Sequence, residues 1–190
     1  MSKYAPREWA PDEKPMLPGS PSTPAHSTRV RLAYFVVGLL VSITGGLGNA
    51  LVSVNLLHLQ GVMGATQTEI AWLPAAYVMA NASMNLLLVK FRQQFGLRLF
   101  TEFFLVLYAL VTFAHLFVGG LGSAIAVRAF HGMLAAALST LGLYYTLQAF
   151  TKPWRLKGLT IALGVAQLSL PLAYIFSNDL LQIAEWNGLY

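Results

Sequence analysis

The amino-acid sequence predicts an all-α membrane protein with five transmembrane helices, and three observations lead to this prediction. First, 56% of the 190 residues are hydrophobic and 10% are charged, whereas about a quarter of the residues of a soluble domain are charged. Second, the charged residues leave five long gaps, each wide enough for the roughly 20 predominantly apolar residues that cross a bilayer. Third, unpaired backbone amides are costly in hydrocarbon, so these stretches have to be helices. The predicted spans are residues 32–54, 67–89, 100–118, 123–150 and 158–175.

The segment ahead of the first span differs from the rest in composition. Residues 1–28 hold six of the nine prolines and mix charges without apolar periodicity. Such a segment buries too little apolar surface to offset the entropy of folding. We therefore expect a disordered tail over residues 1–28 and a transmembrane bundle over residues 29–190.

Local signals mark the boundaries and bends of the spans. Thr66 and Glu69 have the spacing of a capping box at the start of the second span. Glycines at 119, 120 and 122 separate the third span from the fourth. Pro74 and Pro171 are expected to bend the second and fifth spans. The Gly45-Gly46-x-Gly48 run lies inside the first span, where it predicts close helix packing rather than a nucleotide-binding loop.

The cations predict the orientation of the spans. Lysine and arginine in short loops stay on the cytoplasmic side of a membrane. The loops around residues 58–66 and 119–122 contain neither, so we expect the N-terminus in the cytoplasm and the chain in the inner (plasma) membrane. This topology also explains the net charge of +5 without a nucleic-acid partner. Eleven of the twelve cations lie in the tail or on the cytoplasmic side: Lys3, Arg7, Lys14, Arg29, Arg31, Lys90, Arg92, Arg98, Lys152, Arg155 and Lys157.

After the fifth span the sequence has no sixth. Residues 178–190 leave that span on the outer side, and Trp186 and Tyr190 suit a membrane interface. We expect the chain to be a truncated, split or partial protein. Its predicted partners are the lipid bilayer, a small-molecule substrate, and either missing C-terminal helices or a second chain.

Two motifs carry a resemblance to a known family. Trp72, Tyr77 and the Ala80-Asn81-Ala82 step stand at the start of the second span. This segment resembles the second helix of the fourteen-helix drug:proton antiporter branch of the major facilitator superfamily. The fourth span contains Arg128 and Gly132, which resemble the Arg-x-x-x-Gly motif of the same superfamily. The resemblance implies that Arg128 takes part in proton coupling, and that the five spans belong to an N-terminal six-helix bundle, a partial major facilitator fold.

Other family motifs are only partly present. Of the cytoplasmic loop motif after the second helix, the sequence keeps Gly96 and Arg98, with Gln93 where an aspartate is usual. Gly48 or Asn49 occupies the region of the first helix that often carries an acid in the family. Of the fifth-helix antiporter motif, the sequence keeps Pro171.

Polar residues inside the spans are the candidate functional residues. Arg128 is the only cation whose position the predicted topology does not explain. A charge inside a membrane needs a partner or a water-filled cavity. Since the five spans hold no deep aspartate or glutamate, its ionic partner is expected from a missing helix, a substrate or a lipid. Polar stripes on the first two spans are expected to face the bundle interior, where they line a substrate path or bond helix to helix. The candidate path residues are Asn49, Ser53, Tyr77, Asn81, Asn85 and His131.

These features predict a transporter rather than an enzyme. The sequence shows no nucleophile and base pair, no metal-binding pattern and no cofactor motif. Efflux of small amphipathic molecules by an ion-coupled secondary transporter, an antiporter of the multidrug type, is the preferred prediction. The alternative is a shortened, non-transporting membrane protein that binds or regulates another membrane protein.

Overall fold

The computed structural model describes residues 27–184, and within this range the side chains at 89, 92–98, 152, 183 and 184 are outside the description. The tail predicted over residues 1–28 therefore lies outside the described residues, except that Thr28 already begins the first helix. All regular secondary structure of the described range is helical. The helices are α1 (Thr28–Val54), α2 (Leu56–Met63), α3 (Gln67–Ile70), α4 (Trp72–Ala114), η1 (His115–Phe117), α5 (Leu121–Ala149), η2 (Lys152–Trp154), α6 (Arg155–Gln167) and α7 (Ser169–Ala184).

Four stretches of these helices are long and apolar enough to cross a membrane. They are Thr28–Val54, Leu99–Phe117, Leu121–Ala149 and Arg155–Gln182. They coincide with the predicted first, third, fourth and fifth spans, although most extend further than the sequence indicates. The protein is thus an all-helical chain with several helices suited to a membrane.

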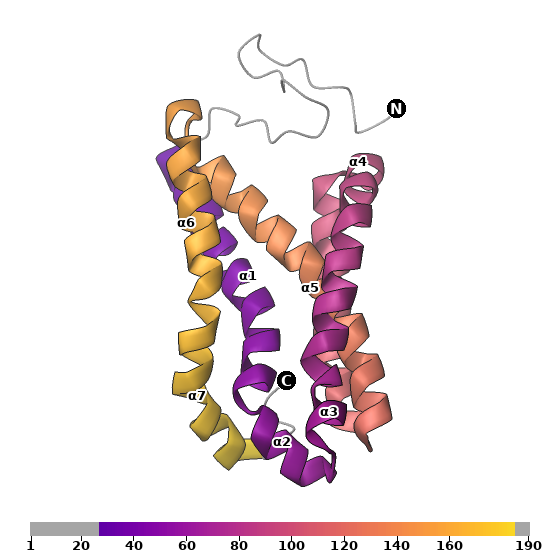
Figure 1. The fold of residues 1–190 in the computed structure, drawn as a ribbon. Helices are drawn as coiled ribbons and strands as arrows, with labels where there is room; N and C mark the ends of the chain where they lie inside the picture. The colour runs from indigo at the N-terminus through magenta and orange to yellow at the C-terminus, as the bar shows by residue number, and fades with distance from the viewer. Residues whose placement is uncertain (1–26, 185–190) are drawn as a thin grey trace.

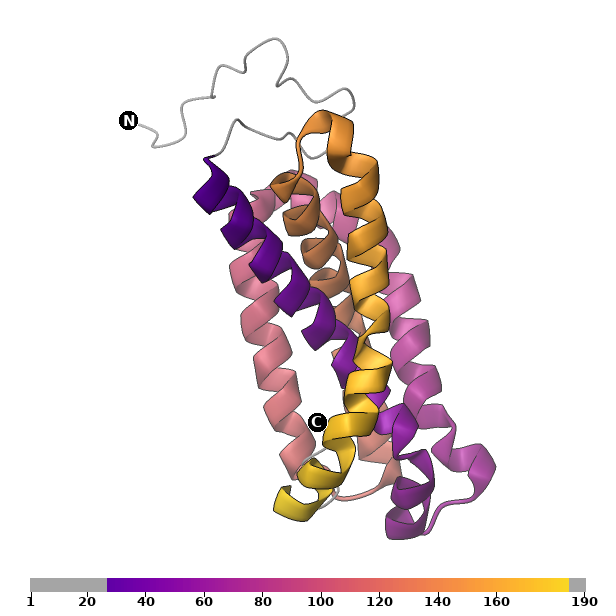
Figure 2. The ribbon, with the colours of Figure 1, turned by 90° about the vertical axis from the view of Figure 1, so that its left-hand side faces the viewer.

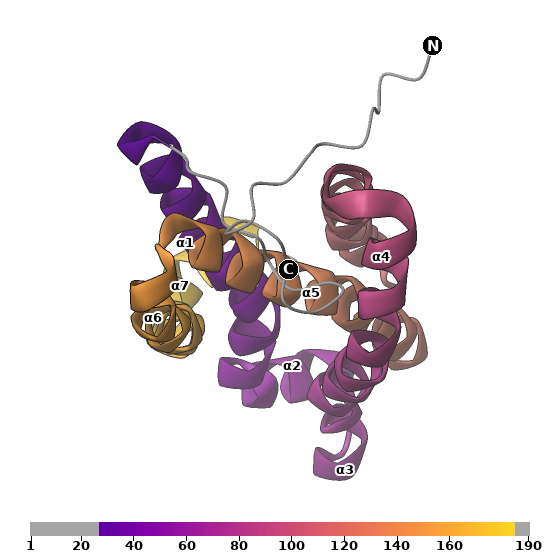
Figure 3. The same ribbon diagram turned by 90° about the horizontal axis from the view of Figure 1, so that it is seen from above.

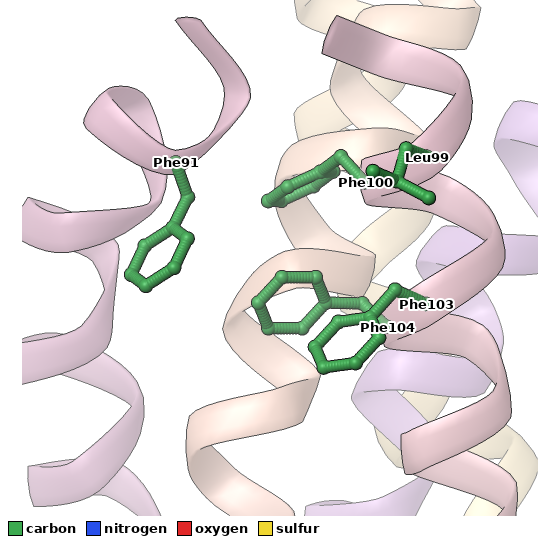
Figure 4. Close-up of a pocket in the computed structure, with 5 residues that line it drawn as sticks. All are labelled: Phe91, Leu99, Phe100, Phe103 and Phe104. Carbon is green, nitrogen blue, oxygen red and sulfur yellow. The ribbon is translucent and has the colours of Figure 1, made fainter. Parts of the chain in front are cut away.

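The predicted second and third spans are both parts of α4, which folds back on itself. Tyr77 and Tyr108 both lie against His131, with ring centroids 5.7 and 4.6 Å from the imidazole. Thirty-one residues of straight helix would separate the two tyrosines by about 46 Å. The chain must therefore reverse between them (Figure 1), and in Figure 2 the two arms stand apart, with α5 visible between them. The reversal falls between Phe91 and Leu99, which lie on opposite arms in Figure 4.

This reversal corrects one detail of the sequence analysis. Residues 90–98 are expected to form a loop between two helices, but they are assigned to the same helix as both arms. The connection keeps helical backbone geometry while it turns the chain around. We call residues 72–91 the first arm of α4 and residues 99–114 its second arm.

Two of the helix breaks fall three residues before a proline. The break between α3 and α4 is at Ala71, ahead of Pro74, and the break between α6 and α7 is at Leu168, ahead of Pro171. Proline has no backbone N–H, so the carbonyl four residues earlier loses its helical partner. Regular bonding resumes one residue after the second proline, where Leu172 N–H donates to Leu168 at 3.1 Å. A helix break thus stands next to each of the two prolines, and this mechanism accounts for it.

The helices are arranged around α5. Its most extensive contacts are with α4 and α1, and α6 and α7 pack on α1. Figure 3 shows α5 between α4 on one side and the α1, α6 and α7 group on the other. In Figure 1 the start of α1, the reversal of α4 and η2 lie at one end, which we call the cation-rich end; α2 and α3 lie at the opposite end.

Small residues let α1 approach its neighbours closely. A Cβ at Gly45 would stand 3.2 Å from the Cβ of Leu138 on α5, and one at Gly46 would stand 2.7 Å from the Cβ of Ser169 on α7. A Cβ at Gly48 would stand 2.7 Å from the hydroxyl of Tyr108. The predicted packing role of this glycine run is confirmed, as expected for membrane helices that associate through backbone proximity.

Candidate functional site

Arg128 is fully buried near the start of α5, about 10 Å along the helix from Leu121. Its guanidinium donates to the carbonyl oxygen of Gly48 at 2.6 Å and to Oδ1 of Asn49 at 2.7 Å, both on α1. The guanidinium carbon stands 4.4 Å from the centre of the Tyr77 ring on α4. One side chain on α5 therefore joins three helices.

Arg128 has neutral partners among the described residues. A backbone carbonyl, an amide oxygen and an aromatic face lie against the cation, while an ionic partner from outside the five spans remains an expectation. Hydrogen bonds to a charged group are stronger than those between neutral groups, and an aromatic face adds a cation–π contribution. Neutral groups of α1 and α4 thus contribute to the environment of a buried positive charge.

Tyr77 and Asn81 attach the first arm of α4 to its neighbours. The Tyr77 hydroxyl donates to the Gly45 carbonyl of α1 at 2.9 Å. Asn81 Nδ2 donates to the carbonyl of Gly132 on α5 at 3.2 Å. A Cβ at Gly132 would collide with the carbonyl of Tyr77, so the Arg-x-x-x-Gly spacing places the arginine and a close helix contact on one face of α5.

His131 lies at the centre of a buried aromatic cluster one turn beyond Arg128. Its side chain is 1% exposed, and the rings of Tyr77, Tyr108 and His115 surround it. Its Nε2 is 3.4 Å from Oγ1 of Thr112 on the second arm of α4. Within the described range no third His, Cys, Asp or Glu joins the two histidines to make a metal site.

The structure brings together five of the predicted site residues and leaves others apart. Arg128, Asn49, Tyr77, His131 and Gly132 form one contiguous group, and Asn81 borders it. Ser53 is exposed and bonds only within its own helix, to the Asn49 carbonyl. Pro171 is exposed at the bend of α7, and Gly96 and Arg98 lie at the reversal of α4, where side chains are outside the description.

Exposure of Ser53 corrects the prediction that the whole polar stripe of the first span faces the bundle interior, whereas Asn85 on the second span faces a cavity between the helices. Asn85 bonds within its helix, to Asn81, and its exposed side chain lines a cavity of about 240 Å³. This polar cavity lies between α1, the first arm of α4, α5 and α6. Its lining combines hydroxyl, amide and aliphatic groups without a charged side chain: Ser42, Asn85, Ser139, Thr140, Leu143, Ala162, Leu163 and Ala166.

Several residues of these sites were not singled out from the sequence. Ser42, Ser139 and Thr140 are ordinary small polar residues inside apolar spans, and only the crossing of the helices collects them at one cavity. Tyr108 and Thr112 are one helical turn apart along one face. That spacing would have indicated a polar stripe on the third span.

A second cavity, at the cation-rich end, is lined by apolar side chains of the described residues. It has a volume of about 230 Å³ and lies between the two arms of α4 (Figure 4). Phe91 extends from the first arm, and the second arm contributes the rest of the lining: Leu99, Phe100, Phe103 and Phe104. The described residues that line this cavity offer no polar group for a reaction.

The described helices and their buried polar group define the class of this chain as an all-helical protein suited to a membrane. Comparisons of the chain with protein-family models, with curated proteins and with solved structures found no significant match.

Proposed function

We propose that this chain is part of a secondary transporter that exports small amphipathic molecules across the plasma membrane. The single observation that supports it most is the buried Arg128, which joins α1, α4 and α5. A membrane helix carries a buried charge only at a cost of about 2.5–3.5 kcal/mol on insertion scales. Intramembrane charges of this kind mark substrate or ion pathways more often than simple packing.

Two further features agree with this proposal. The polar cavity is lined by Ser42, Asn85, Ser139 and Thr140 beside aliphatic side chains, a chemistry that suits a molecule with both polar and apolar parts. The Trp72 and Tyr77 pair and the Arg128 and Gly132 pair also resemble motifs of the major facilitator superfamily. By that resemblance the chain would supply the N-terminal bundle and the partner helices would complete the transport path.

The orientation belongs to the same proposal. The start of α1, the reversal of α4 and η2 lie at one end of the bundle, and these segments with the start of α6 carry eight of the twelve lysines and arginines. Because such loops stay in the cytoplasm, we place the cation-rich end and the N-terminus on the cytoplasmic side.

The test is an efflux assay with the full-length native gene product in cells. Cells are loaded with ethidium or with Nile red, one cationic and one neutral amphipathic dye, and dye loss is followed with wild type, Arg128→Ala and the exposed-lysine control Lys157→Ala at matched expression. Faster dye loss with wild type and Lys157→Ala than with Arg128→Ala supports the proposal. Equal flux for Arg128→Ala and wild type contradicts the role of the arginine, and equal flux for all proteins and empty vector favours the non-transporting alternative.

A further inference from the structure

The imidazole of His131 has one nitrogen with a partner and one without. Thr112 Oγ1 donates its proton to the Tyr108 carbonyl at 2.9 Å, so it can only accept from His131. The 3.4 Å contact is therefore an Nε2–H donated to Thr112. The neutral ring consequently carries its proton on Nε2, and the lone pair is on Nδ1.

The Nδ1 atom is buried and has no hydrogen-bond partner among the described residues. Buried polar atoms in folded proteins are paired in the great majority of cases, so an unpaired one asks for an explanation. A lone pair on imidazole nitrogen is a base, and a proton is the simplest ligand that it takes. The geometry of the ring thus selects Nδ1 as the atom that would receive it.

The surroundings of the ring link its charge to Arg128. Among the residues that the structure describes, the titratable groups that face His131 are Tyr77 and Tyr108 from the two arms of α4, His115 from η1, and Arg128 from α5 itself. On α1, Gly48 lies against the His131 ring, since a Cβ at this position would stand 2.9 Å from Cε1 of His131.

Arg128 and His131 contact the same two features of the bundle. The Arg128 guanidinium and the His131 imidazole both lie against the Tyr77 ring, and both meet α1 at Gly48. Two positive charges on one aromatic ring in a medium of low dielectric constant repel each other. Protonation of His131 is therefore unfavourable while Arg128 stays in its present position.

We propose that Nδ1 of His131 is a proton-binding site that controls the contact of Arg128 with α1. A proton from the aqueous phase adds to the Nδ1 lone pair, the ring becomes imidazolium, and no covalent bond breaks. The charged ring then displaces the guanidinium from Gly48 and Asn49, which loosens α5 from α1. By linkage, whatever holds Arg128 against Asn49 also keeps the proton off His131.

Nuclear magnetic resonance of the full-length wild-type chain in lipid nanodiscs tests the site itself. The chain is labelled with ¹⁵N-histidine, and its four histidines are assigned from single His→Gln variants. At neutral pH we expect the His131 Nε2–H tautomer, and on acidification we expect Nδ1 to move from the imine-type to the pyrrole-type range. A ring that keeps one tautomer down to the pH at which the chain unfolds overturns the proposal.

Spin-label distances test the link to the helices. The chain has no cysteine, so Leu40→Cys on α1 and Phe130→Cys on α5, both exposed, place one label on each helix. Acidification should shift the distance between labels by about 1–2 Å, the usual size of an interhelical shift. The shift should persist in His58→Gln, whose ring is exposed on α2, and disappear in His131→Gln. A shift that survives in His131→Gln contradicts the control by His131.

This inference rests on the proposed function only for the use of the proton in transport, and the two fail in different ways. Titration of His131 with no dye efflux leaves the proton site in place and removes the transport proposal. Dye efflux without a pH response of His131 leaves the transport proposal in place and removes the proton site. Since the wild-type resonance of His131 can also be assigned by elimination from the other three His→Gln variants, the measurement remains decisive if His131→Gln does not fold.

Discussion

Gly132 on α5 lies directly against the backbone of Tyr77 on α4. A Cβ at Gly132 would come within 2.8 Å of both the Cα and the carbonyl carbon of Tyr77. Because these are backbone atoms, no side-chain rotation can make room. The same tyrosine donates its hydroxyl to Gly45 on α1 and offers its ring to Arg128, so the separation of α4 from α5 sets the geometry of the whole site.

The first prediction follows from this contact. Gly132→Ala should lower the free energy of unfolding by about 1–3 kcal/mol, the usual cost of overpacking, because α4 and α5 have to move apart. Thermal or denaturant unfolding in detergent measures the loss. Gly164→Ala on α6 is the matched control, since a Cβ there meets nothing within 4 Å. Equal stability of Gly132→Ala and wild type would show that the helices are not in this close contact.

A second prediction concerns the amide that accepts from Arg128. Asn49→Ala should destabilise the chain by about 1–3 kcal/mol, because a guanidinium nitrogen loses its acceptor while it stays buried. Unfolding in detergent again provides the measurement. Ser53→Ala, one turn along the same helix, should have little effect, since that hydroxyl is exposed and bonds only to Asn49 of its own helix. Equal losses for both variants would mean that the amide of Asn49 is not held by Arg128.

The third prediction concerns the bend between α6 and α7. Pro171→Ala restores a backbone N–H that can donate to Gln167, so the break at Leu168 should straighten. Spin labels at Leu156→Cys and Phe176→Cys, two exposed positions on either side of the bend, should then move further apart. Pro153→Ala, in the η2 connection, should leave the distance unchanged. An unchanged distance in Pro171→Ala would place the cause of the bend in packing against α1.

The fourth prediction tests a contact between α7 and Asn55, the residue between α1 and α2. Ser177 donates to Oδ1 of Asn55 at 2.6 Å, and Asn55 Nδ2 donates to the Leu51 carbonyl. A double-mutant cycle of Asn55→Ala and Ser177→Ala should give a coupling energy of about 0.6 to 1.7 kcal/mol, the range found for polar contacts between membrane helices. The exposed Ser83→Ala, which bonds within its own helix, should show no coupling to Asn55→Ala.

A fifth prediction tests the proposed orientation. In the cysteine-free chain, Gly61→Cys should react with a membrane-impermeant maleimide added to intact cells, because α2 lies at the end opposite the cations. Lys157→Cys should react only after the membrane is opened. The reverse pattern would invert the topology.

The extent of the helices was largely predictable from the sequence. Hydrophobicity is a property of each segment taken alone, so the charge-free stretches predict the spans whatever their neighbours are. The capping box is equally local, and the structure confirms both of its bonds, the Thr66 N–H to Glu69 Oε2 at 2.8 Å and the Glu69 N–H to Thr66 Oγ1 at 3.3 Å. The bends at Pro74 and Pro171 follow from a missing N–H and are local as well.

The tertiary structure decided which polar residues meet. Asn49 and Ser53 are one turn apart on the same helix, yet only Asn49 reaches Arg128. Asn81 and Asn85 are also one turn apart, yet Asn81 bonds to α5 and Asn85 lines the polar cavity. These differences depend on the rotation of each helix about its axis, which is set where glycines such as Gly48 and Gly132 allow two backbones to approach. Composition thus determined that this chain forms membrane helices, whereas the close contacts between helices determined the partners of its buried arginine and histidine, because a contact between residues far apart in sequence is a property of the packed bundle.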